Sequence, residues 1–346
     1  MKYNKLGRTD LDISVIGLGT MTWGLQNTQA EGFEQMDYAL AQGVNFFDTA
    51  EMYAIPPSAE TYGATETIIG NWFASRLNRD KVILASKIAG PGLSWIRDGK
   101  NIIDRKNIQL AVDASLKRLQ TDYIDLYQLH WPNRGSYHFG QVWDYAPKFD
   151  VQAEQDNFLE VLQTMQDLIQ AGKIRHIGLS NETAWGMTQW LQLAEKNNLP
   201  RMASIQNEYS LICRHFEPDL SEIAMHEDCG LLAWSPLCRG MLSGKYLNGA
   251  RPEGARITIE TRPEHRIYPQ TDAAIKEYID LAKAHDLDAC QMALSFVNNQ
   301  PFVSSTLIGA TNMAQLKSNI DSIDLNLSDE VYQQIKNIRR EYPMPF

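Results

Sequence analysis

The amino-acid sequence predicts an α/β protein, a (β/α)₈ TIM barrel in which residues 1–346 form one domain. Short apolar runs alternate with stretches of helical periodicity through eight cycles, as in strands that are each followed by a helix. Segments such as VILAS and IDLYQL read as buried parallel strands, which are apolar over most of their length. The chain has 346 residues, enough for a barrel of about 250 residues with long loops. An open doubly wound sheet is the alternative.

A β-hairpin is predicted over residues 2–14, with the GRTD sequence at 7–10 as its turn. The eight barrel strands are expected at Val15–Gly19, Val44–Asp48, Val82–Ser86, Tyr123–Leu129, Ile174–Leu179, Ala203–Gln206, Leu231–Trp234 and Val303–Ile308. Helices are expected near 31–42, 64–75, 108–118, 157–171, 183–196, 218–228, 273–285, 287–298, 312–320 and 328–340.

Four insertions interrupt the repeat, at 54–63, 88–105, 131–156 and 238–270, and each of them follows a strand. In a barrel they share the C-terminal face, where active sites form. The third insertion carries a cluster of ring-bearing residues, namely Tyr137, His138, Phe139, Trp143, Tyr145 and Phe149. We expect this loop to be a wall of the substrate pocket, although a surface loop can also pack its own aromatic side chains.

The composition is 44% hydrophobic and 21% charged, as in chains that bury a core. A net charge of −10 argues against a protein that binds nucleic acid through a basic face. The four cysteines are widely spaced and suit reduced thiols better than disulfides or a zinc site. No apolar stretch has the length of a signal peptide or a membrane span. We expect a cytoplasmic protein without a membrane partner, and the oligomeric state stays open.

Ionisable side chains follow three successive predicted strands. Asp48 ends the second strand and Tyr53 comes five residues later, Lys87 follows the third strand, and His130 follows the fourth. Singly, each has an ordinary structural explanation: a turn former, a solvated lysine, a packed tyrosine or a structural histidine. Together they would converge on one mouth of a barrel, which favours a catalytic group.

These four side chains suit proton donation to an oxygen that gains negative charge as hydride reaches the adjacent carbon. A tyrosine hydroxyl has a pKa of about 10, too high for an efficient acid near neutrality. A nearby lysine ammonium would lower that pKa, and a carboxylate such as Asp48 would hold Lys87 in place and charged. His130 would orient the substrate oxygen. The pattern indicates carbonyl reduction.

Eight motifs resemble those of the aldo-keto reductase family, in the same order over essentially the whole chain. They are GLGTMTWG at 17–24, DTAEMY at 48–53, SK at 86–87, QLHW at 128–131, KIRHIGLSN at 173–181, SIQNEY at 204–209, AWSPLCRG at 233–240 and IGATNMAQLKSN at 308–319. The resemblance implies NADP(H)-dependent reduction of aldehydes or ketones to alcohols, with Tyr53 as the general acid. Lys87, Asp48 and His130 would assist it.

The resemblance also implies a set of cofactor-binding residues. Ser180, Asn181 and Gln206 would bind the nicotinamide carboxamide, and Trp234 would stack on the nicotinamide ring. The other members are Gly19, Thr20 and Met21 after the first strand, Ser235, Leu237, Arg239 and Gly240 along the pyrophosphate, and Gly309, Thr311, Gln315 and Asn319 at the adenosine end. At the adenosine end, backbone N–H groups of a helix N-terminus would favour a phosphate.

The sequence departs from the better-known monomeric reductases of that family at the 2′-phosphate site. A lysine and an arginine grip the phosphate there, whereas the matching residues in this chain, Gly309 and Gln315, are neutral. Lys317, Arg239 or Lys245 are alternatives for the missing charge. We expect NADP as the cofactor, with NAD possible.

Three other classes of protein were weighed against the reductase. A Rossmann dehydrogenase is disfavoured because GLGTMT lacks the third glycine of G-x-G-x-x-G. A metal-dependent hydrolase is disfavoured because there is no H-x-H or H-E-x-x-H pair, and we expect no metal. A nicotinamide-loaded redox sensor or regulatory binding protein stays as the alternative, because fold alone does not fix function.

Overall fold

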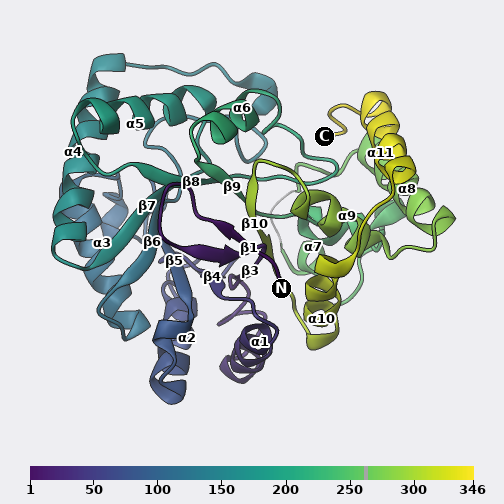
Figure 1. Cartoon of the computed structure of the whole chain (residues 1–346), viewed down its shortest axis with the longest axis horizontal. Helices are drawn as coiled ribbons and strands as arrows, with labels where there is room; N and C mark the ends of the chain where they lie inside the picture. The colour runs from purple at the N-terminus through teal and green to yellow at the C-terminus, as the bar shows by residue number, and fades with distance from the viewer. Residues whose placement is uncertain (261–263) are drawn as a thin grey trace.

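A closed ring of eight parallel strands forms the centre of the computed structural model, which describes residues 1–260 and 264–346. The strand order is β10-β3-β4-β5-β6-β7-β8-β9, so strands adjacent in the sequence are paired and β10 closes the ring against β3. Helices surround this ring on the outside (Figure 1). The predicted TIM barrel is therefore confirmed.

The barrel strands lie within two residues of the predicted positions at either end. They are β3 (Ile16–Gly19), β4 (Phe46–Asp48), β5 (Ile83–Ile88), β6 (Ile124–Leu129), β7 (Ile174–Ser180), β8 (Met202–Gln206), β9 (Gly230–Ala233) and β10 (Val303–Ile308). Their register sets Lys87 opposite Gln128 and Ser180 opposite Gln206 at the carboxyl ends of the strands. This end of the barrel therefore carries a ring of polar side chains.

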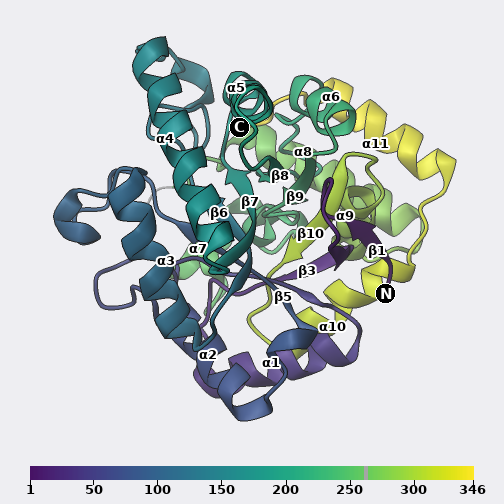
Figure 2. The ribbon, with the colours of Figure 1, turned by 60° about the vertical axis from the view of Figure 1, so that its left-hand side comes forward.

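The helices are α1 (Gln29–Ala41), α2 (Ala64–Arg76), α3 (Arg105–Leu119), α4 (Val151–Gln170), α5 (Ala184–Lys196), α6 (Asp219–His226), α7 (Arg256–Ile259), α8 (Pro269–Ala284), α9 (Ala289–Asn298), α10 (Met313–Asp321) and α11 (Asp329–Glu341). Both ribbon views show α11 beside α8, at the edge of the ring of helices (Figures 1 and 2). None of the described helices combines the length and apolar character that a membrane span requires.

Two insertions differ from the sequence prediction. Helix α4 begins at Val151, so the third insertion ends at Asp150 and not at 156. The Asp150 side chain caps this helix by accepting the Ala153 N–H, and the first turns are largely exposed, so they lack the apolar periodicity that was used to predict helices. The fourth insertion contains the short helix α7. Residues 261–263 of this insertion lie outside the described part of the chain.

The predicted hairpin pairs β1 (Tyr3–Lys5) with β2 (Asp12–Ser14) and closes the N-terminal end of the barrel. Its side chains Leu6, Leu11 and Ile13 pack with apolar side chains that point into the barrel interior. The turn comes close to the barrel wall at Gly7, where φ is +56° and a Cβ atom would lie 2.4 Å from the Ala203 carbonyl oxygen. Only glycine fits this conformation without strain.

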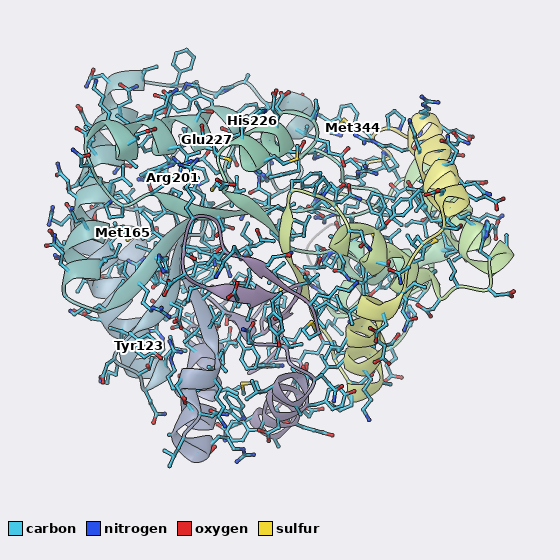
Figure 3. The ribbon with its side chains drawn as sticks, in the orientation of Figure 1. Tyr123, Met165, Arg201, His226, Glu227 and Met344 are labelled. Carbon is cyan, nitrogen blue, oxygen red and sulfur yellow. The ribbon has the colours of Figure 1, made fainter. Side chains whose placement is uncertain are left out.

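Buried and half-buried ion pairs also fasten the N-terminal end of the barrel. Asp125, near the start of β6, accepts hydrogen bonds from the Arg79 and Arg175 guanidinium groups at 2.7 and 2.8 Å and from the Leu84 N–H at 2.9 Å. Arg201, just before β8, lies beside Glu227 after α6 (Figure 3). These contacts lie at the end of the barrel opposite the predicted site.

We expect Ile13→Ala to lower the free energy of unfolding by about 2 to 5 kcal/mol, because Ile13 is fully buried and its loss leaves a cavity. Urea denaturation followed by circular dichroism measures this change. Lys5→Ala, on the exposed face of the same hairpin, is the control and should change stability by less than about 0.5 kcal/mol. Equal effects of the two substitutions would contradict a role of the hairpin in the core.

Candidate active site

The four ionisable residues predicted from the strand ends lie together at the carboxyl end of the barrel. Lys87 Nζ donates to Asp48 Oδ2 at 2.6 Å and to the Thr49 carbonyl oxygen at 2.8 Å. The same Nζ lies 5.1 Å from the centre of the Tyr53 ring, and that ring lies edge-on to the His130 ring at 5.8 Å. All four side chains are buried. Strands β4, β5 and β6 thus bring a carboxylate, a phenol, an ammonium and an imidazole together.

Two glutamines complete the surroundings of the Asp48 carboxylate. Gln206 Nε2 donates to Asp48 Oδ1 at 2.8 Å and to Gln128 Oε1 at 3.1 Å, while Gln128 Nε2 donates to Asp48 Oδ1 at 3.1 Å. The sequence analysis missed Gln128. Its position two residues before His130 could have indicated it, because residues two apart in a strand share one face.

The protonation states follow from burial and from the lysine. Burial raises the pKa of the Tyr53 hydroxyl, and the Lys87 ammonium offsets only part of this rise. The lysine therefore acts in the expected direction, but the expected net lowering of the Tyr53 pKa was wrong because desolvation outweighs it. Burial opposes the charge on Lys87 most strongly, yet Asp48 and Tyr53 together outweigh burial and raise the Lys87 pKa. Tyr53 is thus protonated and Lys87 charged at neutral pH.

His130 is neutral at physiological pH. Burial holds the pKa of its imidazole well below the usual value, and the nearby Lys87 ammonium lowers it further. Its Nδ1 atom is buried and has no hydrogen-bond partner among the residues that the structure describes. Buried polar atoms are normally paired, so an unpaired ring nitrogen at a barrel mouth is a feature of a ligand site.

The residues predicted to meet the nicotinamide carboxamide lie beside the four ionisable residues. Ser180 Oγ donates to the Gln206 carbonyl oxygen at 2.9 Å, and Asn181 Nδ2 donates to the His130 carbonyl oxygen at 2.8 Å. Trp234 Nε1 donates to Asn181 Oδ1 at 3.2 Å, which fixes the orientation of the indole. The ring of Phe139 stacks on Trp234 at 6.1 Å with 24° between the planes. The indole face therefore accepts a flat ring.

The predicted residues after β3 lie on the same rim as Asp48. Thr20 Oγ1 donates to the Asp48 carbonyl oxygen at 2.9 Å, and Met21 packs in the apolar cluster that contains Tyr53. Gly19 ends β3 opposite Asp48, and a Cβ there would lie 3.0 Å from the Ile308 carbonyl oxygen. The backbones of β3 and β10 thus approach closely at this point.

The segment after β9 contains the predicted residues Ser235, Leu237, Arg239 and Gly240. Ser235, Arg239 and Gly240 all have positive φ angles, so the chain turns sharply, and Ser235 Oγ accepts the Arg239 N–H at 3.1 Å. The Arg239 guanidinium forms ion pairs with Glu260 and Glu264 from the fourth insertion. This arginine, one of three proposed sources of positive charge, is therefore paired with two carboxylates.

Arg256, at the start of α7, is a cation near the site, and it was not predicted from the sequence. Burial, together with the positive charges of Arg239 and Arg266, lowers the pKa of its guanidinium to about 9. It lies close enough to Tyr53 for the charge of a phenolate to raise its pKa. A cation whose charge is disfavoured in this way is stabilised by an incoming anion.

The four residues predicted for the adenosine end lie at the N-terminus of α10 and along its first turns. Asn312 caps this helix, and Gln315 Oε1 accepts the Thr311 N–H at 3.0 Å. Asn319 Nδ2 donates to the Gly309 carbonyl oxygen at 3.3 Å. A Cβ at Gly309 would meet no atom within 4 Å, so the backbone here borders open space.

Three buried glutamates that follow barrel strands each bind an arginine from a loop at the mouth. The pairs are Glu51 with Arg97, Glu182 with Arg134, and Glu208 with Arg266. These glutamates were not predicted from the sequence, although each stands within three residues of a predicted site residue. A buried carboxylate requires a partner, so glutamates at these positions predict cations in the loops.

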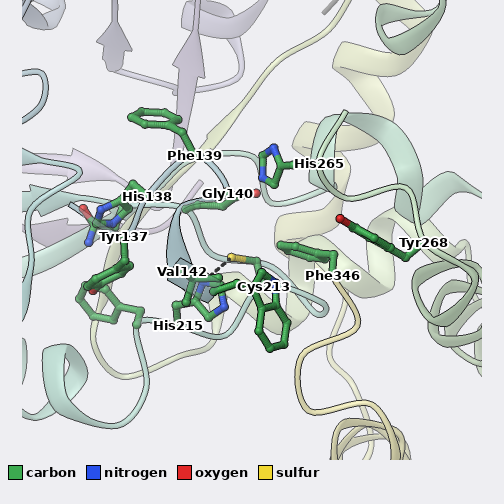
Figure 4. A pocket seen from close by; sticks show the side chains of 14 residues that line it. Tyr137, His138, Phe139, Gly140, Val142, Cys213, His215, His265, Tyr268 and Phe346 are labelled. Atoms are coloured by element: carbon green, nitrogen blue, oxygen red, sulfur yellow. Dashed lines mark hydrogen bonds between the residues drawn. The ribbon is translucent and has the colours of Figure 1, made fainter. Parts of the chain in front are cut away.

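A cavity of about 60 Å³ lies between the third and fourth insertions (Figure 4), and Phe139, one of its wall residues, stacks on Trp234. Its walls include Phe139, Trp143, Tyr268 and Phe346, and three histidines, His138, His215 and His265, also line it. A dashed line in Figure 4 marks the hydrogen bond between the Cys213 thiol and the His215 ring. The aromatic loop thus contributes a pocket wall next to the predicted nicotinamide position.

The match to the model of the aldo/keto reductase family extends over residues 15–340. The chain therefore belongs to this family and is an NAD(P)H-dependent oxidoreductase. A small-molecule substrate fits an enzyme of this kind.

Among curated proteins, the chain is similar to Protein tas of Escherichia coli, with 49% identity over 352 residues that cover 100% of this chain and 99% of the relative. This likeness supports membership of the Tas subgroup. The chain is 32% identical to the uncharacterized oxidoreductase YrpG of Bacillus subtilis, covering 98% of this chain and 96% of the relative. It is 30% identical to norsolorinic acid reductase stcV of Emericella nidulans, covering 94% and 78%.

The neutral state of His130 predicts a loss of stability in acid. Its pKa is near 6.5 in the unfolded chain and well below that in the folded one, so the unfolded chain binds the extra proton as the pH falls below 6.5. Between pH 7 and pH 5 this linkage removes about 2 kcal/mol of stability. We expect His130→Asn to abolish that part of the pH dependence in urea denaturation.

His226→Asn is the matched control for this experiment, because His226 is exposed at the end of α6 and its ring contacts water in both states. It should leave the decline between pH 7 and pH 5 as in the parent protein. An unchanged decline in His130→Asn would mean that the imidazole takes up a proton in the folded barrel.

Proposed function

We propose that this chain is a cytoplasmic NADP(H)-dependent reductase of aldehydes or ketones, acting as one domain over residues 1–346. The observation that carries the proposal is the buried Lys87, whose ammonium lies between the Asp48 carboxylate and the Tyr53 ring. Binding a cofactor alone needs no phenol beside an ammonium, whereas proton donation to a carbonyl oxygen does. The four cysteines are all free thiols, which supports a reducing compartment.

In this proposal Tyr53 donates the proton. Its hydroxyl is protonated in the buried site, so it is ready to donate to an oxygen that becomes negative during reduction. A nicotinamide cofactor held at this site would supply the hydride. Lys87 then stabilises the phenolate that remains on Tyr53, and Asp48 with its two glutamine partners holds Lys87 charged.

His130 orients the substrate. Its neutral imidazole carries an unpaired buried Nδ1, so the ring has hydrogen-bonding capacity for a carbonyl oxygen beside Tyr53. A neutral ring does not compete with Tyr53 as the acid, since the imidazole holds no extra proton at pH 7. The phenol and the imidazole thus divide the work of proton transfer and orientation.

The residues around the mouth fit a nicotinamide dinucleotide. Ser180, Asn181 and Gln206 line one side of the site, and the stacking of Phe139 on Trp234 supports the indole face as the place for the flat nicotinamide ring. Open space at Gly309 leaves room for the backbone to approach the adenosine phosphates. These groups would hold the two ends of the cofactor.

Charge around the fourth insertion supports a phosphate-bearing cofactor. Arg239 and Arg256 lie in this insertion, and burial beside other cations disfavours the charge on Arg256 until an anion arrives. Lys317 and Lys245, the other sequence-based sources of charge, lie over the rings of Tyr38 and Tyr246. We therefore assign a phosphate contact to Arg256. Because Arg256 lies close to Tyr53, this contact would reach the pyrophosphate that NAD and NADP share, and NADP stays the proposed cofactor, with NAD possible.

The substrate class is proposed from the pocket walls. Phe139, Trp143, Tyr268 and Phe346 provide aromatic surface near Trp234, which suits a carbonyl compound with an aromatic body. A relative is named for the reduction of norsolorinic acid, so that compound belongs in the panel of substrates.

Tyr53→Phe is expected to lower carbonyl reduction about 10²- to 10⁴-fold and to leave cofactor binding unchanged, because it removes only the proton donor. Loss of NADPH absorbance with a panel of aliphatic and aromatic aldehydes and ketones measures turnover. Near-normal turnover by a folded Tyr53→Phe protein would overturn the assignment. If the parent protein is no faster than Tyr53→Phe, the alternative of a redox sensor or regulatory binding protein holds.

Arg256→Met is expected to weaken NADPH binding about tenfold, because one charge-assisted contact to a phosphate is lost. Titration by isothermal calorimetry measures the dissociation constant, and a parallel titration with NADH reports whether the 2′-phosphate is involved. Lys276→Met, an exposed lysine paired with Asp280 on α8, is the control and should bind NADPH like the parent. Unchanged affinity in Arg256→Met would remove this arginine from the cofactor site.

A further inference from the structure

Glu51 is a fully buried carboxylate in the segment that joins Asp48 to Tyr53. Four hydrogen bonds reach its two oxygens. The Ala89 N–H donates to Oε1 at 2.8 Å and the Tyr62 hydroxyl to Oε2 at 2.7 Å, while Arg97 donates one guanidinium N–H to each oxygen at 2.8 and 2.9 Å. Two of these bonds are charge-assisted and come from one guanidinium group, so the position of Glu51 is closely determined.

The carboxylate extends the pairing between two strands beyond the point where β4 ends. The Thr49 N–H donates to the Ala85 carbonyl oxygen at 2.9 Å, and the Glu51 N–H donates to the Lys87 carbonyl oxygen at 3.2 Å. Ala89 comes directly after β5, and its N–H donates to the Glu51 side chain. The chain is therefore held against β5 until just before Tyr53.

The partner of Glu51 comes from the other wall around Tyr53. Arg97 follows Ile96, and Ile96 packs with Ala50, Ala89 and Tyr53 in one apolar cluster. The ion pair thus ties the segment that carries Tyr53 to the loop that packs against its ring. Losing the charge on Glu51 would loosen both sides of this contact.

We propose that Glu51 is a positioning residue for Tyr53, acting through Arg97 to hold the phenol against Lys87 and His130. The proposal rests on the proposed function, in which Tyr53 donates the proton. Proton transfer is sensitive to such placement, because a misplacement of 1 Å can reduce a rate by about 10²-fold. In the described part of the chain, Glu51 forms no hydrogen bond with the Lys87 ammonium or the His130 ring, so its effect passes through the backbone and Arg97.

Asp125 offers a matched control at the opposite end of the barrel. It is also buried, it also accepts hydrogen bonds from guanidinium groups, and it also binds a backbone N–H of β5, that of Leu84. Asp125→Asn and Glu51→Gln therefore remove equivalent charges from equivalent surroundings. Only Glu51 lies next to Tyr53.

The experiment compares Glu51→Gln, Asp125→Asn and the parent protein by thermal denaturation, NADPH titration and steady-state kinetics with one aldehyde. Both variants should have a lower melting temperature and bind NADPH within about twofold of the parent. Glu51→Gln alone should lower kcat by about tenfold or more and raise the solvent deuterium isotope effect on kcat, because proton donation becomes slower. Asp125→Asn should keep the kcat and the isotope effect of the parent.

Arg97→Lys is a second variant in case Glu51→Gln does not fold. It keeps the positive charge but loses the two-pronged contact, and it should lower kcat in the same direction by a smaller factor. The inference is overturned if kcat is unchanged in these variants, or if Asp125→Asn lowers kcat as much as Glu51→Gln does. If Tyr53→Phe retains normal turnover, the proposed function fails. Tyr53→Phe therefore distinguishes a failure of the proposed function from a failure of the Glu51 inference.

Discussion

A lysine buried inside a closed barrel is the constraint on which the rest of the site depends. Removing an ammonium from water costs several kcal/mol, and the cost is offset only if the charge is paired and fully hydrogen-bonded. Lys87 meets this condition through Asp48 and a carbonyl oxygen, and Asp48 in turn needs Gln128 and Gln206. Strands β4, β5, β6 and β8 are therefore all required to support one charge. The protonated Tyr53 and the neutral His130 follow from the same burial.

The loops around the mouth obey the same rule at a larger scale. Each glutamate placed just after a strand is buried, so each one requires a cation, and the arginine that supplies it comes from a long insertion. The fourth insertion contains further ion pairs, in which arginines and glutamates alternate: Arg266 binds both Glu208 and Glu264, and Arg239 also binds Glu264. Ion pairs thus determine where otherwise irregular segments lie.

Features with a local pattern could be predicted from the sequence. The strands are apolar runs, and residues at strand ends in a barrel must meet, so the grouping of Asp48, Tyr53, Lys87 and His130 followed from their order alone. Features set by three-dimensional surroundings were missed. The start of α4 is exposed and has no apolar periodicity, and the net direction of the Tyr53 pKa depends on how deeply the phenol is buried. Arg256 gave no signal because the sequence does not show how the fourth insertion folds, and that fold brings Arg256 close to Tyr53.

The Arg134–Glu182 ion pair holds the start of the third insertion in place, whereas, among the described residues, those after Arg134 lack such an anchor until Asp150. Arg134 is fixed beside Glu182 within four residues of His130, and the helix cap at Asp150 fixes the other end. The residues between them carry the pocket aromatics, several of them exposed, such as Phe139 and Trp143. Segment 135–149 therefore has anchored ends. In the proposed function, its sequence can differ with the substrate while Asp48, Tyr53, Lys87 and His130 keep their positions. Under this proposal, substrate selectivity and proton transfer depend on different segments of the chain, so one can change without the other.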